Sequence, residues 1–176
     1  SILGRDMLIM SRFDKTQDGL ADVGATMGPN VVIRWERRDD RILVRAVSHA
    51  TTADPADNVY RAVEAGSFPA VAASLPLASR TEGSGPAGGA STVDVTDLFL
   101  GDHPLFSLPN NQRSQRGIQG HDRDRSWLEW VRTFPENVEV RVVRTYRSSN
   151  PPSAGRGGAV SFEVNHSMIL LPEEPM

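Results

Sequence analysis

Val31-Val32-Ile33-Arg34-Trp35-Glu36 and Ile42-Leu43-Val44-Arg45-Ala46-Val47 flank the charged turn Arg37-Arg38-Asp39-Asp40-Arg41, and together they predict a β-hairpin. Both arms are rich in β-branched residues, which fit the pleated surface of a strand. Apolar and polar residues nearly alternate along each arm, as expected for a strand with one face in the core and one in water. The hairpin therefore indicates a protein built on antiparallel sheet.

Further strands are expected along the rest of the chain. Apolar or alternating stretches bounded by turn residues lie at Met7 to Phe13, Ala70 to Leu77, Ser91 to Val95, Val138 to Tyr146 and Ala159 to Leu171. The last two predict a long hairpin. A short helix or a turn fits Asp57 to Ala65, and a second short helix fits the stretch that begins at Thr96-Asp97 and stops at Gly101.

Four large apolar side chains follow a helical spacing. Trp127, Trp130, Val131 and Phe134 stand at i, i+3, i+4 and i+7, which is one face of an α-helix. Pro135 suits the end of such a helix. We therefore expect a helix here, with its aromatic face in the core rather than in a ligand site.

These stretches predict a mainly β protein (α+β in minor part) with antiparallel, sandwich-like sheets, one or two short helices and long loops. A length of 176 residues suits one domain with a sizeable core, so we expect a single β-rich domain over residues 1–176. Flexible connectors are expected near residues 79–91, 101–122 and 148–158, which are rich in Gly, Pro and polar residues.

The composition argues against several classes of protein. The net charge is -3 and acidic residues interrupt the arginine-rich stretches, so we expect no nucleic-acid partner. No apolar run approaches the roughly 20 residues that span a bilayer. We therefore expect no transmembrane segment in this chain, and membrane association only through partners. The absence of Cys leaves out disulfides and thiolate metal sites.

The sequence contains no strong catalytic or metal-binding motif. The four histidines are far apart, and no pair has the spacing of metal ligands. Asp94 and Asp97 could form an acid–base pair, but Asp97 fits a helix cap at least as well, and Asp94 suits an ion pair with an arginine. Neither a Gly-x-Ser-x-Gly elbow nor a phosphate-binding loop is present. We therefore expect no cofactor and no enzyme activity.

Several sequence blocks, in this order along the chain, resemble a known family. They are Leu3-Gly4-Arg5-Asp6, Val32-Ile33-Arg34-Trp35-Glu36-Arg37, Val93-Asp94-Val95-Thr96-Asp97-Leu98-Phe99, Phe134-Pro135-Glu136-Asn137-Val138-Glu139-Val140 and the closing run Leu170-Leu171-Pro172-Glu173-Glu174-Pro175-Met176. Together they resemble a domain of unknown function that precedes the zincin catalytic domain in large secreted bacterial zinc-dependent metalloproteases. The family-motif residues are Leu3, Gly4, Arg5, Asp6, Arg34, Glu36, Asp94, Thr96, Asp97, Phe134, Pro135 and Asn137.

The resemblance implies a bacterial periplasmic or secreted protein whose signal peptide is not in this chain. Protease activity in that family belongs to a downstream domain with a His-Glu-x-x-His motif, which is absent here, so no catalytic role passes to any residue. One hypothesis is a processed fragment that serves as an accessory structural subunit of a larger periplasmic or membrane-associated assembly. The alternative is an N-terminal domain that helps an intact metalloprotease fold or guides its substrates.

The polar excursion over residues 101–122 offers apolar side chains to a protein partner. Leu105, Phe106 and Leu108 stand among prolines and are candidate anchors. The alternative is that these side chains fold back onto the core of the domain itself. The expected partners are other subunits of an assembly, or the downstream protease domain.

Overall fold

The structure is a computed structural model that describes residues 2–17, 19–80, 90–152 and 157–172. The chain divides into two compact units, each made of segments that are distant in sequence. The first unit comprises Ser1–Met7, Val31–Asp94 and Leu170–Met176, and the second comprises Leu8–Asn30 and Val95–Ile169. The single domain stays a prediction. The centres of two predicted connectors, 81–89 and 153–156, lie outside the described residues.

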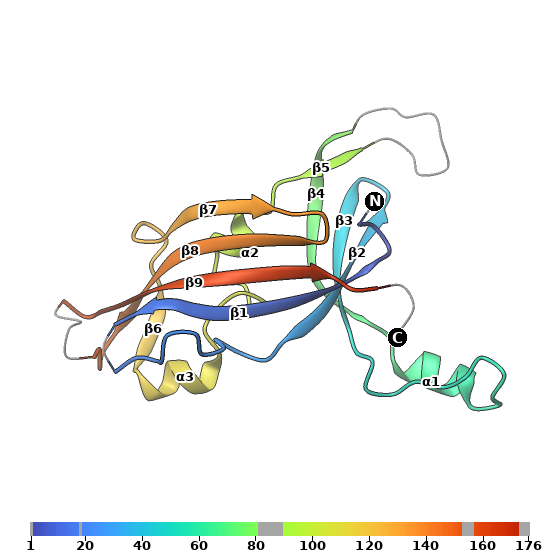
Figure 1. The fold of residues 1–176 in the computed structure, drawn as a ribbon, viewed down its shortest axis with the longest axis horizontal. Helices are drawn as coiled ribbons and strands as arrows, with labels where there is room; N and C mark the ends of the chain where they lie inside the picture. The colour runs from blue at the N-terminus through green and yellow to red at the C-terminus, as the bar shows by residue number, and fades with distance from the viewer. Residues whose placement is uncertain (1, 18, 81–89, 153–156, 173–176) are drawn as a thin grey trace. The chain divides into compact units, whose positions relative to one another are not determined.

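The first unit is built on antiparallel strands. They are β2 (Val31–Arg38), β3 (Arg41–Val47), β4 (Ala70–Arg80) and β5 (Ser91–Val93), in the spatial order β5-β4-β3-β2 (Figure 1). The predicted hairpin is confirmed, because β2 and β3 pair antiparallel with Trp35 opposite Val44. Asp39 in the turn has a φ of 53°, a conformation that Asp tolerates better than most residues. Helix α1 (Tyr60–Gly66) confirms the short helix expected near 57–65.

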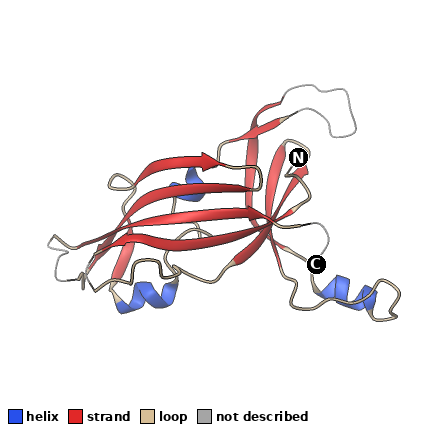
Figure 2. Cartoon of the chain, in the orientation of Figure 1, coloured by secondary structure: helices blue, strands red, loops and turns tan. Residues whose placement is uncertain are grey.

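The two longest strands among the described residues, β8 (Asn137–Ser148) and β9 (Ala159–Leu170), lie almost wholly in the second unit. Strands β1 (Asp6–Thr16), β9 and β8 are neighbours in that order, and both β6 (Ile118–His121) and β7 (Trp127–Thr133) pair with β8. The predicted hairpin of β8 and β9 is confirmed, with Val142 opposite Val164. Two short helices, α2 (Thr96–Leu100) and α3 (Asn110–Gln115), complete the unit (Figure 2).

Alternation along β8 and β9 gives this part of the sheet an inner and an outer face. The inner face is defined by nearly fully buried side chains: Val140, Val142, Val160, Phe162 and Val164. Helix α2 and the loop after it pack on this face, since the Phe99 and Phe106 rings both contact the His166 ring. The core of the second unit therefore lies between the strands and this helix–loop segment.

The predicted fold class is confirmed: the protein is mainly β, antiparallel, with short helices. The described residues hold three helices rather than one or two, because α3 lies inside the excursion 101–122, which also contains β6. That excursion is therefore only partly irregular. No helix in the described ranges is long and apolar enough to span a membrane.

The helix predicted over Trp127 to Phe134 is wrong, because this stretch forms strand β7. Its register with β8 shifts between Leu128 and Trp130, which makes Glu129 the extra residue of a β-bulge. The bulge places Trp127 and Trp130 on the same face although they are three residues apart. A helix-like spacing thus arises from an interrupted strand.

Candidate functional site

The opening motif of the chain is fastened to β2 in the first unit. The Gly4 N–H donates to the Trp35 carbonyl at 2.9 Å, and the φ of Gly4 is 78°, which favours glycine. The Asp6 carboxylate accepts from Arg34 Nε at 2.7 Å and contacts His49 Nε2 at 2.8 Å. Two blocks that are distant in sequence therefore meet in one ion-pair cluster.

The charge of Asp6 is stabilised by its neighbours. Burial by itself raises the pKa of this carboxyl, but hydrogen bonds from Arg34 and His49 outweigh burial and lower the pKa below its ordinary value. The closing motif joins the same region, since the Leu171 N–H donates to the Asp6 carbonyl at 2.9 Å and Arg5 donates to the Leu171 carbonyl at 3.2 Å. The cluster thus ties three segments of the first unit together.

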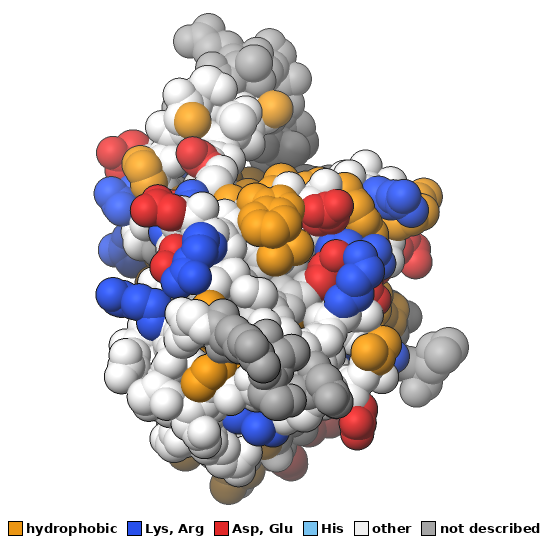
Figure 3. All heavy atoms as spheres, turned by 90° about the vertical axis from the view of Figure 1, so that its left-hand side faces the viewer, with side chains coloured by type: hydrophobic (Ala, Val, Ile, Leu, Met, Phe, Trp, Pro, Cys, Tyr) orange, Lys and Arg blue, Asp and Glu red, His pale blue; other side chains and the backbone are white. Residues whose placement is uncertain are grey.

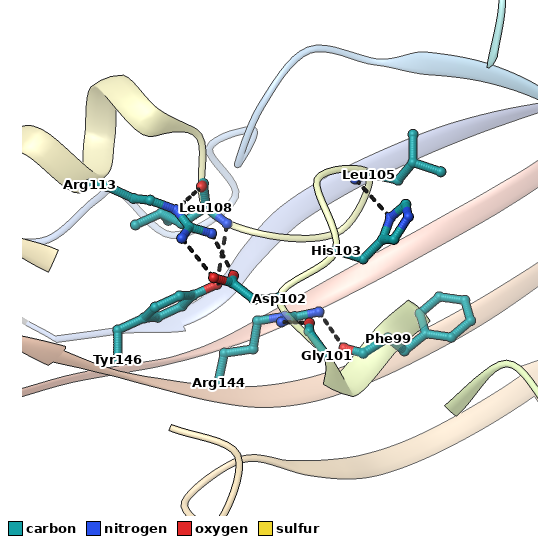
Figure 4. Close-up of polar contacts among 9 residues, drawn as sticks. All are labelled: Phe99, Gly101, Asp102, His103, Leu105, Leu108, Arg113, Arg144 and Tyr146. Carbon is teal, nitrogen blue, oxygen red and sulfur yellow. Dashed lines mark hydrogen bonds and ion pairs between the residues drawn. The ribbon is translucent and has the colours of Figure 1, made fainter. Parts of the chain in front are cut away.

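A polar cluster lies between strand β8 and residues 99–113 of the second unit (Figure 4). Arg144 and Tyr146 in this cluster are buried, and Asp102 is exposed at its edge. Arg144 has no exposed surface and donates to the Gly101 carbonyl at 2.8 Å and to the Phe99 carbonyl. These carbonyls belong to the end of α2, where a cation is favourable. Burial lowers the pKa of Arg144. This guanidinium therefore fixes the helix end to β8.

Asp102 and Arg113 form the second half of the cluster. Arg113 donates two hydrogen bonds to the Asp102 carboxylate, at 2.5 and 2.8 Å. The Nε of Arg113 also donates to the Leu108 carbonyl at 2.6 Å. The Tyr146 hydroxyl donates to Asp102 at 3.2 Å, and the Leu108 N–H donates to the same hydroxyl at 3.4 Å. Burial by itself raises the pKa of Asp102. The hydrogen bond from Arg113 and the positive charge of Arg113 outweigh burial, so the pKa of Asp102 lies below its ordinary value. Both carboxylate oxygens are thus occupied.

Two histidines of the second unit face this cluster from different sides. His166 is fully buried on β9, and its Nδ1 contacts the Ser11 hydroxyl at 2.8 Å. Burial, followed by the charge of Arg144, holds the pKa of His166 well below its ordinary value. Burial and the same arginine also lower the pKa of His121, whose ring meets the Tyr146 ring edge-on at 5.3 Å. Both rings are therefore biased toward the neutral form.

The chemistry of this cluster is structural in character. Both oxygens of the Asp102 carboxylate accept hydrogen bonds, and His166 is fully buried against the rings of Phe99 and Phe106. Within the described ranges, no three His, Asp or Glu side chains gather closely enough to hold a metal ion. The arrangement clamps a loop onto a sheet.

A comparison with protein families identifies the chain. The model of the domain of unknown function DUF5117 matches residues 24–176. The chain belongs to the DUF5117 family. The match confirms that this is a domain of unknown function, and the opening motif Leu3 to Asp6 lies ahead of the matched region. Neither the curated proteins nor the solved structures searched include a match to the chain.

The other family-motif residues of this DUF5117 domain lie in several places. Glu36 accepts from Arg45 Nε at 2.9 Å in the first unit, where Asp94 is exposed. Thr96 and Asp97 begin α2, as predicted for a helix start. Phe134 and Pro135 lie in the turn between β7 and β8, and Asn137 is the first residue of β8, opposite Ile169 of β9. The motif residues therefore mark turns and strand contacts and do not converge on one site.

The candidate partner anchors of the loop are mostly internal. Phe106 and Leu108 expose only 1% and 2% of their surface, and the Phe106 ring packs 4.5 Å from the Phe99 ring. The alternative that they fold back onto the core is thus what the structure shows, because Arg113 and Tyr146 hold the loop down at Leu108. Leu105 is half-buried. Phe106 and Leu108 offer no surface to a partner.

Strand β7 carries exposed apolar side chains, although the sequence pattern predicted a helix with its aromatic face in the core. Trp127, Leu128, Val131 and Phe134 are 51%, 45%, 49% and 55% exposed. In the end-on view of Figure 3, hydrophobic side chains reach the surface among acidic and basic ones. The helix predicted from the sequence placed Trp127, Val131 and Phe134 in the core and did not single out Leu128. Their exposure makes β7 the candidate interaction site of the DUF5117 domain.

The outer face beside β7 carries an aromatic ring between two cations. The guanidinium groups of Arg132 and Arg141 lie 4.6 and 4.5 Å from the centre of the Trp130 ring. Arg141 also forms ion pairs with Asp14 and with Glu163. A cation–π contact at an exposed site contributes about 0.5–1 kcal/mol. The two contacts therefore favour one orientation of the Trp130 ring on the outer side of β7.

Proposed function

We propose that this DUF5117 domain is a non-catalytic protein-interaction module. The observation that carries the proposal is the edge strand β7, where Trp127, Leu128 and Val131, followed by Phe134, are each about half exposed. Large apolar side chains that are exposed close together, here along one edge strand, are typical of protein–protein interaction sites. Tryptophan in particular is enriched among the residues that contribute most to binding energy.

The state of the titratable side chains supports a role without catalysis. A general base must reach a substrate proton, whereas the ring of His166 is fully buried. The Asp102 carboxylate is partly exposed, but both of its oxygens already accept hydrogen bonds, from Arg113 and from Tyr146. The Asp6 carboxylate is likewise engaged by Arg34 and His49. In the proposed function, Asp6, Asp102 and His166 stabilise the fold and take part in no reaction.

The resemblance of the sequence blocks to the front domain of secreted zinc metalloproteases makes the proposal more specific. In this version the domain is an accessory structural subunit of a periplasmic or membrane-associated assembly. The alternative is a folding or substrate-guiding domain of an intact metalloprotease.

The experiment compares the domain with a variant that carries Leu128→Lys and Val131→Lys. Native isolation from the source should yield the domain with bound protein, and the double variant should lose it while keeping its circular dichroism spectrum. Val71→Lys is the matched control, because Val71 is 50% exposed on β4. Peptidase and esterase assays with and without zinc should show no turnover. Hydrolysis above background, or unchanged association of the double variant, would refute the proposal.

A further inference from the structure

We propose that two copies of this chain join through the edges of their β7 strands, so that the strands continue across a two-fold axis. The inference rests on the proposed function and deepens it, because it names a second copy as the partner of the same surface. The strand edge, the register and the side-chain faces each lead to this occupant.

The edge of β7 is open to a further strand. Among the described residues β7 pairs with β8 alone, so the backbone groups on its other side lack a strand neighbour. An edge of this kind is a template for another strand. Natural proteins protect such edges with charges, bulges or short length. Strand β7 has a bulge at Glu129 and a charge at Arg132, but it is seven residues long and four of its residues are large and apolar.

The sequence of β7 is self-complementary once the bulge residue Glu129 is set aside. Six residues of β7 then remain, and Phe134 follows them directly. An antiparallel copy centred on Val131 would place each of these seven positions opposite a position of the same set. The resulting pairs are Trp127 with Phe134, Leu128 with Thr133, Trp130 with Arg132 and Val131 with itself. A two-fold interface requires this reciprocity, because residue i must meet residue j while j meets i.

The faces of the strand agree with this register. Residues opposite each other in an antiparallel pair share a face, so the β8 partners define the side of each β7 residue. Trp127, Trp130 and Arg132 lie opposite the outer-face positions of β8, and Leu128, Val131 and Thr133 lie opposite its inner-face positions. Leu128 and Thr133, Trp130 and Arg132, and the two Val131 residues therefore share a face in each proposed pair. Phe134 follows Thr133, and it would lie on the face of Trp127 if the alternation continued by one residue. Without the bulge, pairs such as Trp127 with Phe134 would put opposite faces together.

The pairs also suit each other chemically. Trp127 and Phe134 would form an aromatic pair across the axis, and the exposed Val131 side chains would cover each other. Arg132 already lies 4.6 Å from the Trp130 ring within one copy. It would reach the Trp130 ring of the second copy by the same kind of contact. The four exposed apolar side chains of this edge are thus covered together.

The experiment is a symmetric disulfide in the full chain. The chain contains no Cys, so Val131→Cys supplies a single thiol. Antiparallel partners have Cα atoms about 4.5–5.5 Å apart, within the range that a disulfide spans. Under mild oxidation we expect most of the Val131→Cys chain to become a covalent dimer. Val71→Cys, at an equally exposed position on β4, should stay monomeric.

A charge test gives an independent readout by light scattering. Val131→Asp places two carboxylates at the axis and should give monomers, as should Val131→Lys alone. An equal mixture of the two variants should recover the dimer mass. The inference is overturned if Val131→Cys cross-links no faster than Val71→Cys, or if the mixture stays monomeric. The proposed function would still hold in that case if a different protein binds the domain and is lost from the variant with Leu128→Lys and Val131→Lys.

Discussion

The buried His166 predicts a pH dependence of stability in the mildly acidic range. Its ring contacts Ser11 through Nδ1 and packs 5.9 and 5.2 Å from the ring centres of Phe99 and Phe106. Burial and the nearby Arg144 hold its pKa well below the ordinary value near 6.5. Below about pH 6.5 the unfolded chain therefore binds a proton at His166, whereas His166 in the folded chain stays neutral until the pH falls further.

This difference in proton uptake sets the size of the effect. Folding stability falls by about 1.4 kcal/mol for each pH unit below the unfolded pKa, until the folded histidine itself is protonated. Between about pH 7.5 and 5.0 the expected loss is roughly 2 kcal/mol. His121, whose pKa is also lowered, adds to the slope in the same direction. Carboxylates such as Asp102, whose pKa is lowered, affect stability only at more acidic pH.

Guanidinium chloride unfolding at pH 7.5, 6.0 and 5.0 measures this loss. His166→Gln keeps a polar group for Ser11 and removes the titrating ring, so its free energy of unfolding should lose most of the dependence in this window. His121→Gln is the matched control and should retain most of the slope. A parent chain with equal stability at pH 7.5 and 5.0, or a His166→Gln variant as steep as the parent, refutes the reasoning.

Two further substitutions test the role of the loop cluster. Phe106→Ala should lower the free energy of unfolding by about 3–5 kcal/mol, because it removes a fully buried ring, and should leave association unchanged. If Phe106→Ala kept the full free energy of unfolding but lost association, Phe106 would be a partner anchor after all. Tyr146→Phe should lower the free energy of unfolding by about 1–3 kcal/mol, because Asp102 loses a donor and the Leu108 N–H is left without its acceptor. A neutral Tyr146→Phe would show that Arg113 alone holds the loop.

Local pattern predicted most of the strands. The hairpin of β2 and β3 and the hairpin of β8 and β9 follow from alternation of β-branched and polar residues, which depends on near neighbours only. The helix predicted over Trp127 to Phe134 is wrong because a bulge at Glu129 changes the phase of the strand. Nothing in the local spacing distinguishes that phase change from a helical turn.

The same alternation also predicts which side chains of β8 and β9 belong to the buried part of the cluster. Arg144 and Tyr146 continue the inward phase of Val140 and Val142, and His166 continues the inward phase of β9. Read strictly, alternation places all three in the core. Their counterparts could not be predicted, because the pairing of Asp102 with Arg113 depends on how a long loop folds back over the sheet. Long-range contacts of this kind leave no periodic signal.

Native mass spectrometry of the protein isolated gently from its source tests the central claim most directly. The account predicts that the polypeptide carrying this chain is bound to protein, including a second copy, and that Leu128→Lys with Val131→Lys releases it. A single unbound polypeptide at high concentration, or a complex that survives this double substitution, would contradict the role assigned to β7.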